Sequence, residues 1–194
     1  MGAFTHCGNA LTSFQTSLLE IVMRLILAAA LIAPTALFAN GGNNDTPTKP
    51  TVFCSGSKVY DDKLKKCVAP KESSLERDEL YETVRYLAYA ERYEDAREVL
   101  AAMPVEDSGR LTYMGFTARK LGKMAEAMDY YQQALALDPA NNLARAYMGQ
   151  GFVEDGDTKA ALEQLQAIRA HGGSGTWPEE ALRIAIATGR THNY

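Results

Sequence analysis

Apolar and small residues recur with a period of 34 residues in the C-terminal part of the chain. The stretch "YMGFTARKLG" begins at Tyr113, and "YMGQGFVEDG" begins at Tyr147. In a unit numbered from Ser108, small residues occupy places 8, 15 and 20, and larger apolar residues surround them. A period of this length is typical of two helices joined by a turn, which bury their apolar faces by stacking on copies of themselves. The pattern therefore predicts stacked helix pairs.

The small residues of the unit predict where its helices approach and where the chain turns. Gly115 and Ala127, at places 8 and 20, are expected where the two helices of a pair cross and touch. Gly122, at place 15, is expected in the turn, where a positive φ costs glycine little. Pro139 follows Asp138 and should end the second helix.

These residues resemble the tetratricopeptide repeat. The resemblance covers residues 108–141 and 142–170, although Leu111, Ala118 and Gly173 stand where the family usually has Trp, Tyr and Pro. It implies an all-α fold: a short right-handed α-solenoid of helix pairs with a C-terminal capping helix, preceded here by a small disulfide-closed hairpin.

The resemblance extends into a degenerate first unit and a closing helix. Aligning Ala96 with Ala127 defines the first unit, and an atypical terminal repeat is expected in such arrays. Ser73 with Glu76, and Thr176 with Glu179, have the spacing of capping boxes at helix starts. The helical domain is thus predicted over residues 74–190, with repeats at about 75–107, 108–141 and 142–175 and a capping helix at 176–188.

An apolar run over residues 25–38 predicts a signal peptide at Met23–Ala39. Arg24 precedes the run and small residues follow it. Cleavage is expected after Ala39, with Ala36 as an alternative, and a retained membrane anchor is the competing interpretation. Residues 1–22 are interpreted as an upstream extension or a long n-region, and residues 40–50 as a disordered linker. The expected location is the periplasm or the extracellular space.

Two cysteines remain after the predicted signal peptide, Cys54 and Cys67. An even number of cysteines in an exported chain favours a disulfide. Strand-like residues 58–60 and 66–68 flank a turn-like segment, so residues 51–70 are expected to form a hairpin closed by this bond. A tetrahedral metal site would need more ligands, and the spacing is not that of a Cys-x-x-Cys redox motif.

Composition and motifs favour a binding protein over an enzyme. The formal net charge is −4, which gives no support for nucleic-acid binding. No nucleophile motif, phosphate-binding loop or dinucleotide fingerprint occurs, so no catalytic residue, cofactor or metal is predicted. The glycine-rich "HGGSGTW" is interpreted as a turn, with an anion site as the alternative, and Trp177 as a residue that fixes the closing helix, with a binding platform as the alternative.

The resemblance implies that a protein or peptide binds to the concave face of the array. In the family this groove is lined by places 2, 5, 9, 12 and 13 of the unit, and the carboxylate clamp of some members has no counterpart here. The prediction is an exported, non-enzymatic adaptor of the bacterial cell envelope, without a membrane contact after signal cleavage. The alternative is an envelope glycan-binding protein that uses the hairpin. The predicted groove residues are Tyr81, Arg85, Tyr89, Thr112, Phe116, Arg119, Lys120 and Gln150, with Ala146 and Glu154 beside them.

Overall fold

The computed structural model describes residues 52–191. The predicted upstream extension (1–22), signal peptide (23–39) and linker (40–50) lie outside these residues. Among the described helices, none has the length and apolar character needed to cross a lipid bilayer.

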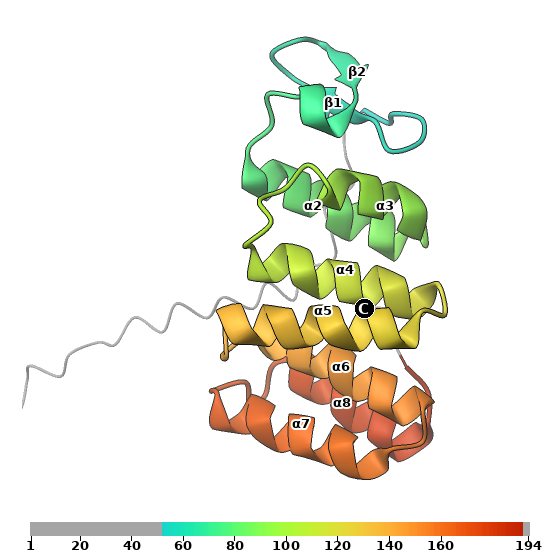
Figure 1. Ribbon diagram of the computed structural model, residues 1–194, viewed down its shortest axis with the longest axis vertical. Coiled ribbons are helices and arrows are strands. Elements are labelled where there is room, and N and C mark those ends of the chain that lie inside the picture. Colours follow the sequence, from blue (N-terminus) through green and yellow to red (C-terminus); the bar gives the residue numbers. More distant parts are fainter. Residues whose placement is uncertain (1–51, 192–194) are drawn as a thin grey trace, which may run out of the picture. The chain divides into compact units, whose positions relative to one another are not determined.

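Antiparallel helix pairs follow one another along the described chain (Figure 1). Within a pair the first helix packs on the second, and the first helices of successive pairs also contact each other. The last helix, α8, packs on both helices of the third pair. The prediction of an all-α, tetratricopeptide-like solenoid with a closing helix is confirmed. The pairs are α2 (Arg77–Tyr89) with α3 (Tyr93–Leu100), α4 (Ser108–Lys120) with α5 (Met124–Leu137), and α6 (Asn142–Glu154) with α7 (Thr158–Ala170), followed by α8 (Trp177–Thr188).

Short polar side chains begin three of these helices. Asp107, Asn141 and Asp157 each accept a hydrogen bond from the backbone N–H three residues ahead, at 2.6, 2.9 and 3.0 Å. Such N-caps satisfy an otherwise unpaired donor in the first turn. The turns between paired helices contain Gly122 and Gly156 with φ of +76° and +80°, as the repeat pattern predicted.

One predicted helix start and both predicted capping pairs differ from the structure. Ser73 follows the short helix η1 (Pro70–Glu72) and donates to the Pro70 carbonyl oxygen at 2.7 Å. The first repeat helix is instead preceded by Glu76, whose N–H donates to Glu79 at 2.9 Å. Thr176 does precede α8, but Glu179 accepts from the Gly175 N–H at 2.7 Å. The predicted Ser73–Glu76 and Thr176–Glu179 pairs were therefore wrong.

Glycine allows close helix packing at two equivalent positions of the repeat. A Cβ on Gly115 would lie 2.6 Å from Cε1 of Tyr131, and a Cβ on Gly149 would lie 2.6 Å from Cδ2 of Leu182. Tyr131 of α5 is thus the nearest neighbour of Gly115, and Ala127 is buried on the same helix. The neighbour of Gly149 is a residue of α8, so the closing helix packs directly against this glycine.

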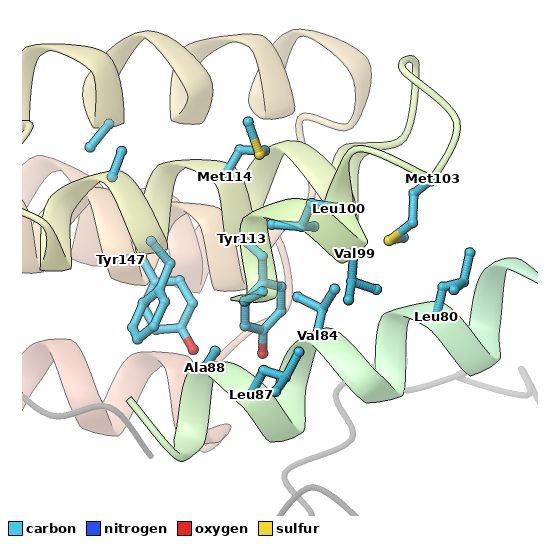
Figure 2. Packing of buried hydrophobic residues seen from close by; sticks show 14 of the residues in the cluster. Leu80, Val84, Leu87, Ala88, Val99, Leu100, Met103, Tyr113, Met114 and Tyr147 are labelled. Carbon is cyan, nitrogen blue, oxygen red and sulfur yellow. The ribbon is translucent and has the colours of Figure 1, made fainter. Parts of the chain in front are cut away.

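The core of the first pairs is made of interlocking aliphatic and aromatic side chains. Figure 2 shows Tyr113 reaching from α4 toward Val84 and Leu87 of α2, with Val99 and Leu100 of α3 close by. All five side chains are buried. The first two helix pairs and α6 are therefore joined by one cluster of buried apolar residues.

A two-stranded hairpin precedes the helices. Strand β1 (Val59–Asp61) pairs antiparallel with β2 (Lys66–Val68), so that Tyr60 lies opposite Cys67. The predicted disulfide between Cys54 and Cys67 is present. Val59 and Val68 are buried in the same core cluster as α2 and α3, so the hairpin packs against the first helix pair.

Candidate binding surfaces on the inner helices and beside the hairpin

A chain of aromatic rings crosses the first helices of the pairs and reaches the closing helix. Neighbouring rings lie 4.7–6.2 Å apart between centroids, most of them edge to face. This is the favoured geometry for aromatic pairs. We call this set the aromatic ladder; its members are Tyr81 of α2, Tyr113 and Phe116 of α4, Tyr147 of α6 and Trp177 of α8.

The aromatic ladder includes two of the predicted groove residues. Tyr81 is half-buried, and Phe116 is fully buried. The ring of Phe116 also lies 6.1 Å from that of Tyr93. Trp177 meets Tyr147 at the start of α8, as expected of a residue that fixes the closing helix. Phe116 therefore has a structural role in addition to any contact with a partner.

Other predicted groove residues are held by bonds within the array. Thr112 is buried, donates to the Ser108 carbonyl oxygen at 2.7 Å and accepts from Asn141 at 3.0 Å. Arg85 is buried and pairs with Glu82 at 2.8 Å. Tyr89 is 49% exposed, and Lys120 is half-buried. The accessible part of the predicted groove thus centres on Tyr89, Lys120 and Tyr81, and the role of all eight residues in binding stays a prediction.

A basic and polar cluster lies between α4 and α6. The guanidinium of Arg119 pairs with Glu154, and its charged centre lies 5.7 Å from the Phe116 ring centroid. The ammonium of Lys120 lies 5.8 Å from the same centroid. Burial, with the nearby Arg119 charge, lowers the pKa of Lys120. Cations over an aromatic face are stabilised by its quadrupole, so Phe116 supports both positive charges.

Several buried polar atoms in this cluster have no hydrogen-bond partner. They are both amide atoms of Gln150 and the hydroxyl of Tyr147. Burial raises the pKa of Tyr131 to about 12 and that of Tyr147 well above its ordinary value, so both hydroxyls stay protonated at neutral pH. An unpaired buried polar group is costly and rare in folded proteins. The cluster therefore holds polar groups whose hydrogen-bonding capacity is unused and which the surrounding side chains separate from solvent.

A family model describes the middle of this surface. The model of the tetratricopeptide repeat matches residues 111–141, which span most of α4 and all of α5. The chain carries a tetratricopeptide repeat. No similar curated protein and no similar solved structure was found.

The matched tetratricopeptide repeat contains four of the predicted groove residues: Thr112, Phe116, Arg119 and Lys120. Residue spacing placed them together on α4, and the structure does bring Arg119 and Lys120 to the same ring. Spacing did not show which of them are buried, because the neighbours that cover them come from other helices. The unpaired amide of Gln150 likewise depends on contacts that periodicity does not specify.

A second surface lies outside the matched tetratricopeptide repeat, between β1 and α2. It is a cleft of about 390 Å³. Val59 and Leu87 are its buried side chains, whereas Phe53 is 53% exposed. The ring centroids of Phe53 and Tyr86 are 5.9 Å apart. The cleft is lined by Val52, Phe53, Cys54, Gly56, Lys58, Val59, Tyr60, Asp62, Thr83, Tyr86, Leu87 and Arg92.

A metal centre needs several acidic, histidine or cysteine side chains close together. Within residues 52–191 no three of them lie close enough to hold a metal ion. The candidate sites are consequently the surface that carries the predicted groove residues on α2, α4 and α6, and the cleft between β1 and α2.

Proposed function

We propose that this chain is a non-enzymatic adaptor that binds a protein or peptide along the inner helices of its array. The observation that carries the proposal is the tetratricopeptide repeat over residues 111–141, because such a repeat supports a general role in protein interaction. Stacked helix pairs curve and present extended concave surfaces. The groove would be formed by α2, α4 and α6.

The composition of this surface supports a segment with apolar and acidic groups as the partner. Tyr89 supplies an exposed ring, and Lys120 supplies a positive charge beside Arg119. The amide of Gln150 can both donate and accept, which is what a peptide unit requires. Reaching this amide requires displacement of the groups that cover it, so we expect binding to be coupled to side-chain rearrangement.

The proposed setting is the bacterial cell envelope. It rests on the sequence pattern of the predicted signal peptide and on the disulfide, since such bonds persist in oxidising compartments. Cell fractionation with N-terminal sequencing tests it. The expected result is a periplasmic protein beginning at Asn40, and a cytoplasmic protein that retains Met1 would contradict it.

Binding to the inner helices is tested with a surface variant and a matched control. Tyr89→Ala with Lys120→Ala removes the accessible ring and charge, whereas Leu162→Ala with Lys159→Ala removes an exposed apolar side chain and a charge from α7. Partners are captured from a periplasmic extract, identified by mass spectrometry, and titrated against both variants. We expect the first variant to bind about thirtyfold more weakly, as when a binding hot spot is removed. The second variant should bind with unchanged affinity. Equal affinities would place the partner elsewhere.

A further inference from the structure

The cleft between β1 and α2 does not coincide with the proposed adaptor surface. None of the eight predicted groove residues lines it. Its volume of about 390 Å³ lies within the range of sites that hold small molecules or single side chains. A ligand there would contact α2 through Thr83, Tyr86 and Leu87 and not through the predicted groove residues.

The shape and lining of the cleft favour an apolar group. Leu87 and Val59 are almost completely buried, and the rings of Phe53, Tyr60 and Tyr86 line the cleft with them. Phe53 leaves about half of its surface exposed. An aromatic or large aliphatic group placed against these rings would remove that surface from water, which is favourable.

The charges of the cleft favour one negative group on the ligand. Arg92 pairs with Asp95 at 2.7 Å and also donates to the Gly56 carbonyl oxygen. Asp62 has Lys65 at 3.5 Å. Lys58 forms no salt bridge within residues 52–191. The uncompensated charge of the cleft is therefore a single ammonium group.

The hydrogen-bonding groups of the cleft do not favour a sugar. A sugar ring presents many hydroxyls, and buried polar groups need partners. The Thr83 hydroxyl already donates to the Glu79 carbonyl oxygen at 3.0 Å, and Arg92 and Asp62 are engaged as described. This counts against the alternative that the hairpin holds an envelope glycan.

We infer that the cleft binds a peptide segment that places one aromatic or large aliphatic side chain against the rings of Phe53 and Tyr86 and a neighbouring carboxylate on Lys58. The rings and aliphatic side chains contact the apolar group, and the polar groups of the lining surround it. The ammonium selects acidic segments, because a charge-assisted hydrogen bond is stronger than a neutral one.

Nuclear magnetic resonance titration of the full chain tests this inference with defined probes. The probe is the blocked dipeptide acetyl-phenylalanyl-aspartyl-amide at millimolar concentration. Two further dipeptides replace its phenylalanine by alanine or its aspartate by lysine, and glucuronate serves as an acidic sugar. We expect the first dipeptide to shift the resonances of Phe53, Tyr60 and Tyr86, and each altered dipeptide to bind about tenfold more weakly. Binding of glucuronate without the dipeptide, or binding of neither, would overturn the inference.

A charge-reversal pair tests the role of Lys58. Lys58→Glu should abolish the preference for the acidic dipeptide, whereas Lys63→Glu, at an exposed position of the hairpin that does not line the cleft, should leave it unchanged. Both variants must keep the amide spectrum of the folded hairpin. If the two variants bind the acidic dipeptide equally well, the carboxylate does not lie on Lys58 and the inference is wrong.

Discussion

The helical array and the hairpin are stabilised in different ways, although they share one core. In the array, buried apolar residues recur along every helix, and glycines let neighbouring helices approach each other. The hairpin has two strands of three residues each and contributes only Val59 and Val68 to the core cluster. A two-stranded hairpin alone is marginally stable in water. The disulfide and polar contacts must therefore provide the stability that buried apolar residues provide in the array.

Those links are visible on each side of the hairpin. The Cys54–Cys67 disulfide closes it. Arg92 donates to the Gly56 carbonyl oxygen at 2.6 Å, and Ser57 donates to Glu98. The buried carboxylate of Asp61 joins the hairpin to the segment before α2. The comparison predicts that changes in packing destabilise the array most, whereas loss of the disulfide and the hydrogen bonds destabilises the hairpin most.

The largest effect is expected from Gly115→Leu in the array. Its Cβ alone would lie 2.6 Å from Tyr131, and Tyr131 is fully buried, so the ring cannot move without displacing its neighbours. Overpacking of this kind should lower the free energy of unfolding by about 3 kcal/mol. Urea denaturation followed by far-ultraviolet circular dichroism measures this change.

The control for this substitution is Gly122→Ala. Gly122 has a φ of +76°, and a Cβ placed there meets nothing within 4 Å. Its cost should be only that of the left-handed backbone, about 1 kcal/mol. If Gly115→Leu costs no more than Gly122→Ala, the close approach does not determine how the array packs.

An effect of similar size, but confined to the hairpin, is expected from loss of the disulfide. Replacing Cys54 and Cys67 by serine should destabilise the hairpin by about 3 kcal/mol, the value expected for a loop of this size. Helix pairs beyond the first should keep their stability, because repeats contact mainly their neighbours. Hydrogen exchange of the Val59 and Val68 amides reports on the hairpin, and circular dichroism reports on the helices. An equal loss in both would show that the two regions unfold as one unit.

The two regions also differ in how far the sequence predicted them. Periodicity located the turn glycines Gly122 and Gly156, since a turn requires only local backbone geometry. It also placed Tyr131 among the large residues that surround Gly115, and the Tyr131 ring is the nearest neighbour of a Cβ at that position. The spacing of Ser73 and Glu76 is repeated by Glu76 and Glu79, so spacing alone could not choose between the two helix starts.

For the candidate binding surfaces, the sequence predicted on which helix a residue lies better than it predicted whether the side chain is accessible. The repeat placed Phe116 and Lys120 on one helix, but the burial of Phe116 follows from rings on α3 and α6. The cleft between β1 and α2 was not predicted from the sequence, since it forms where residues 52–62 meet α2. Residue types in the hairpin predicted the disulfide, whereas no periodic signal marks the contact with α2. Long-range contacts of this kind are not encoded in local patterns.

The smallest expected effect is that of acid on Asp61. Its carboxylate accepts hydrogen bonds from the N–H groups of Ser74 at 2.5 Å and of Leu64 and Lys63 at 2.9 Å each. These bonds, that from Ser74 first, lower the pKa of Asp61 to about 2. In the unfolded chain the pKa is about 3.9, so the unfolded state binds the proton more readily. The stabilising contribution is full above about pH 4 and is lost as the pH falls through about 2.

A carbon-13 titration of the Asp61 carboxyl group, with two variants, tests this link. We expect a titration midpoint near pH 2 for Asp61. Asp61→Asn should speed hydrogen exchange of the Ser74 amide at neutral pH, because the side chain no longer has two acceptor oxygens. Asp62→Asn changes an exposed neighbour and should leave that exchange unchanged. A midpoint near 4, or equal exchange in the two variants, would mean that Asp61 does not join the hairpin to the array, and the disulfide and the apolar contacts would then have to hold it alone.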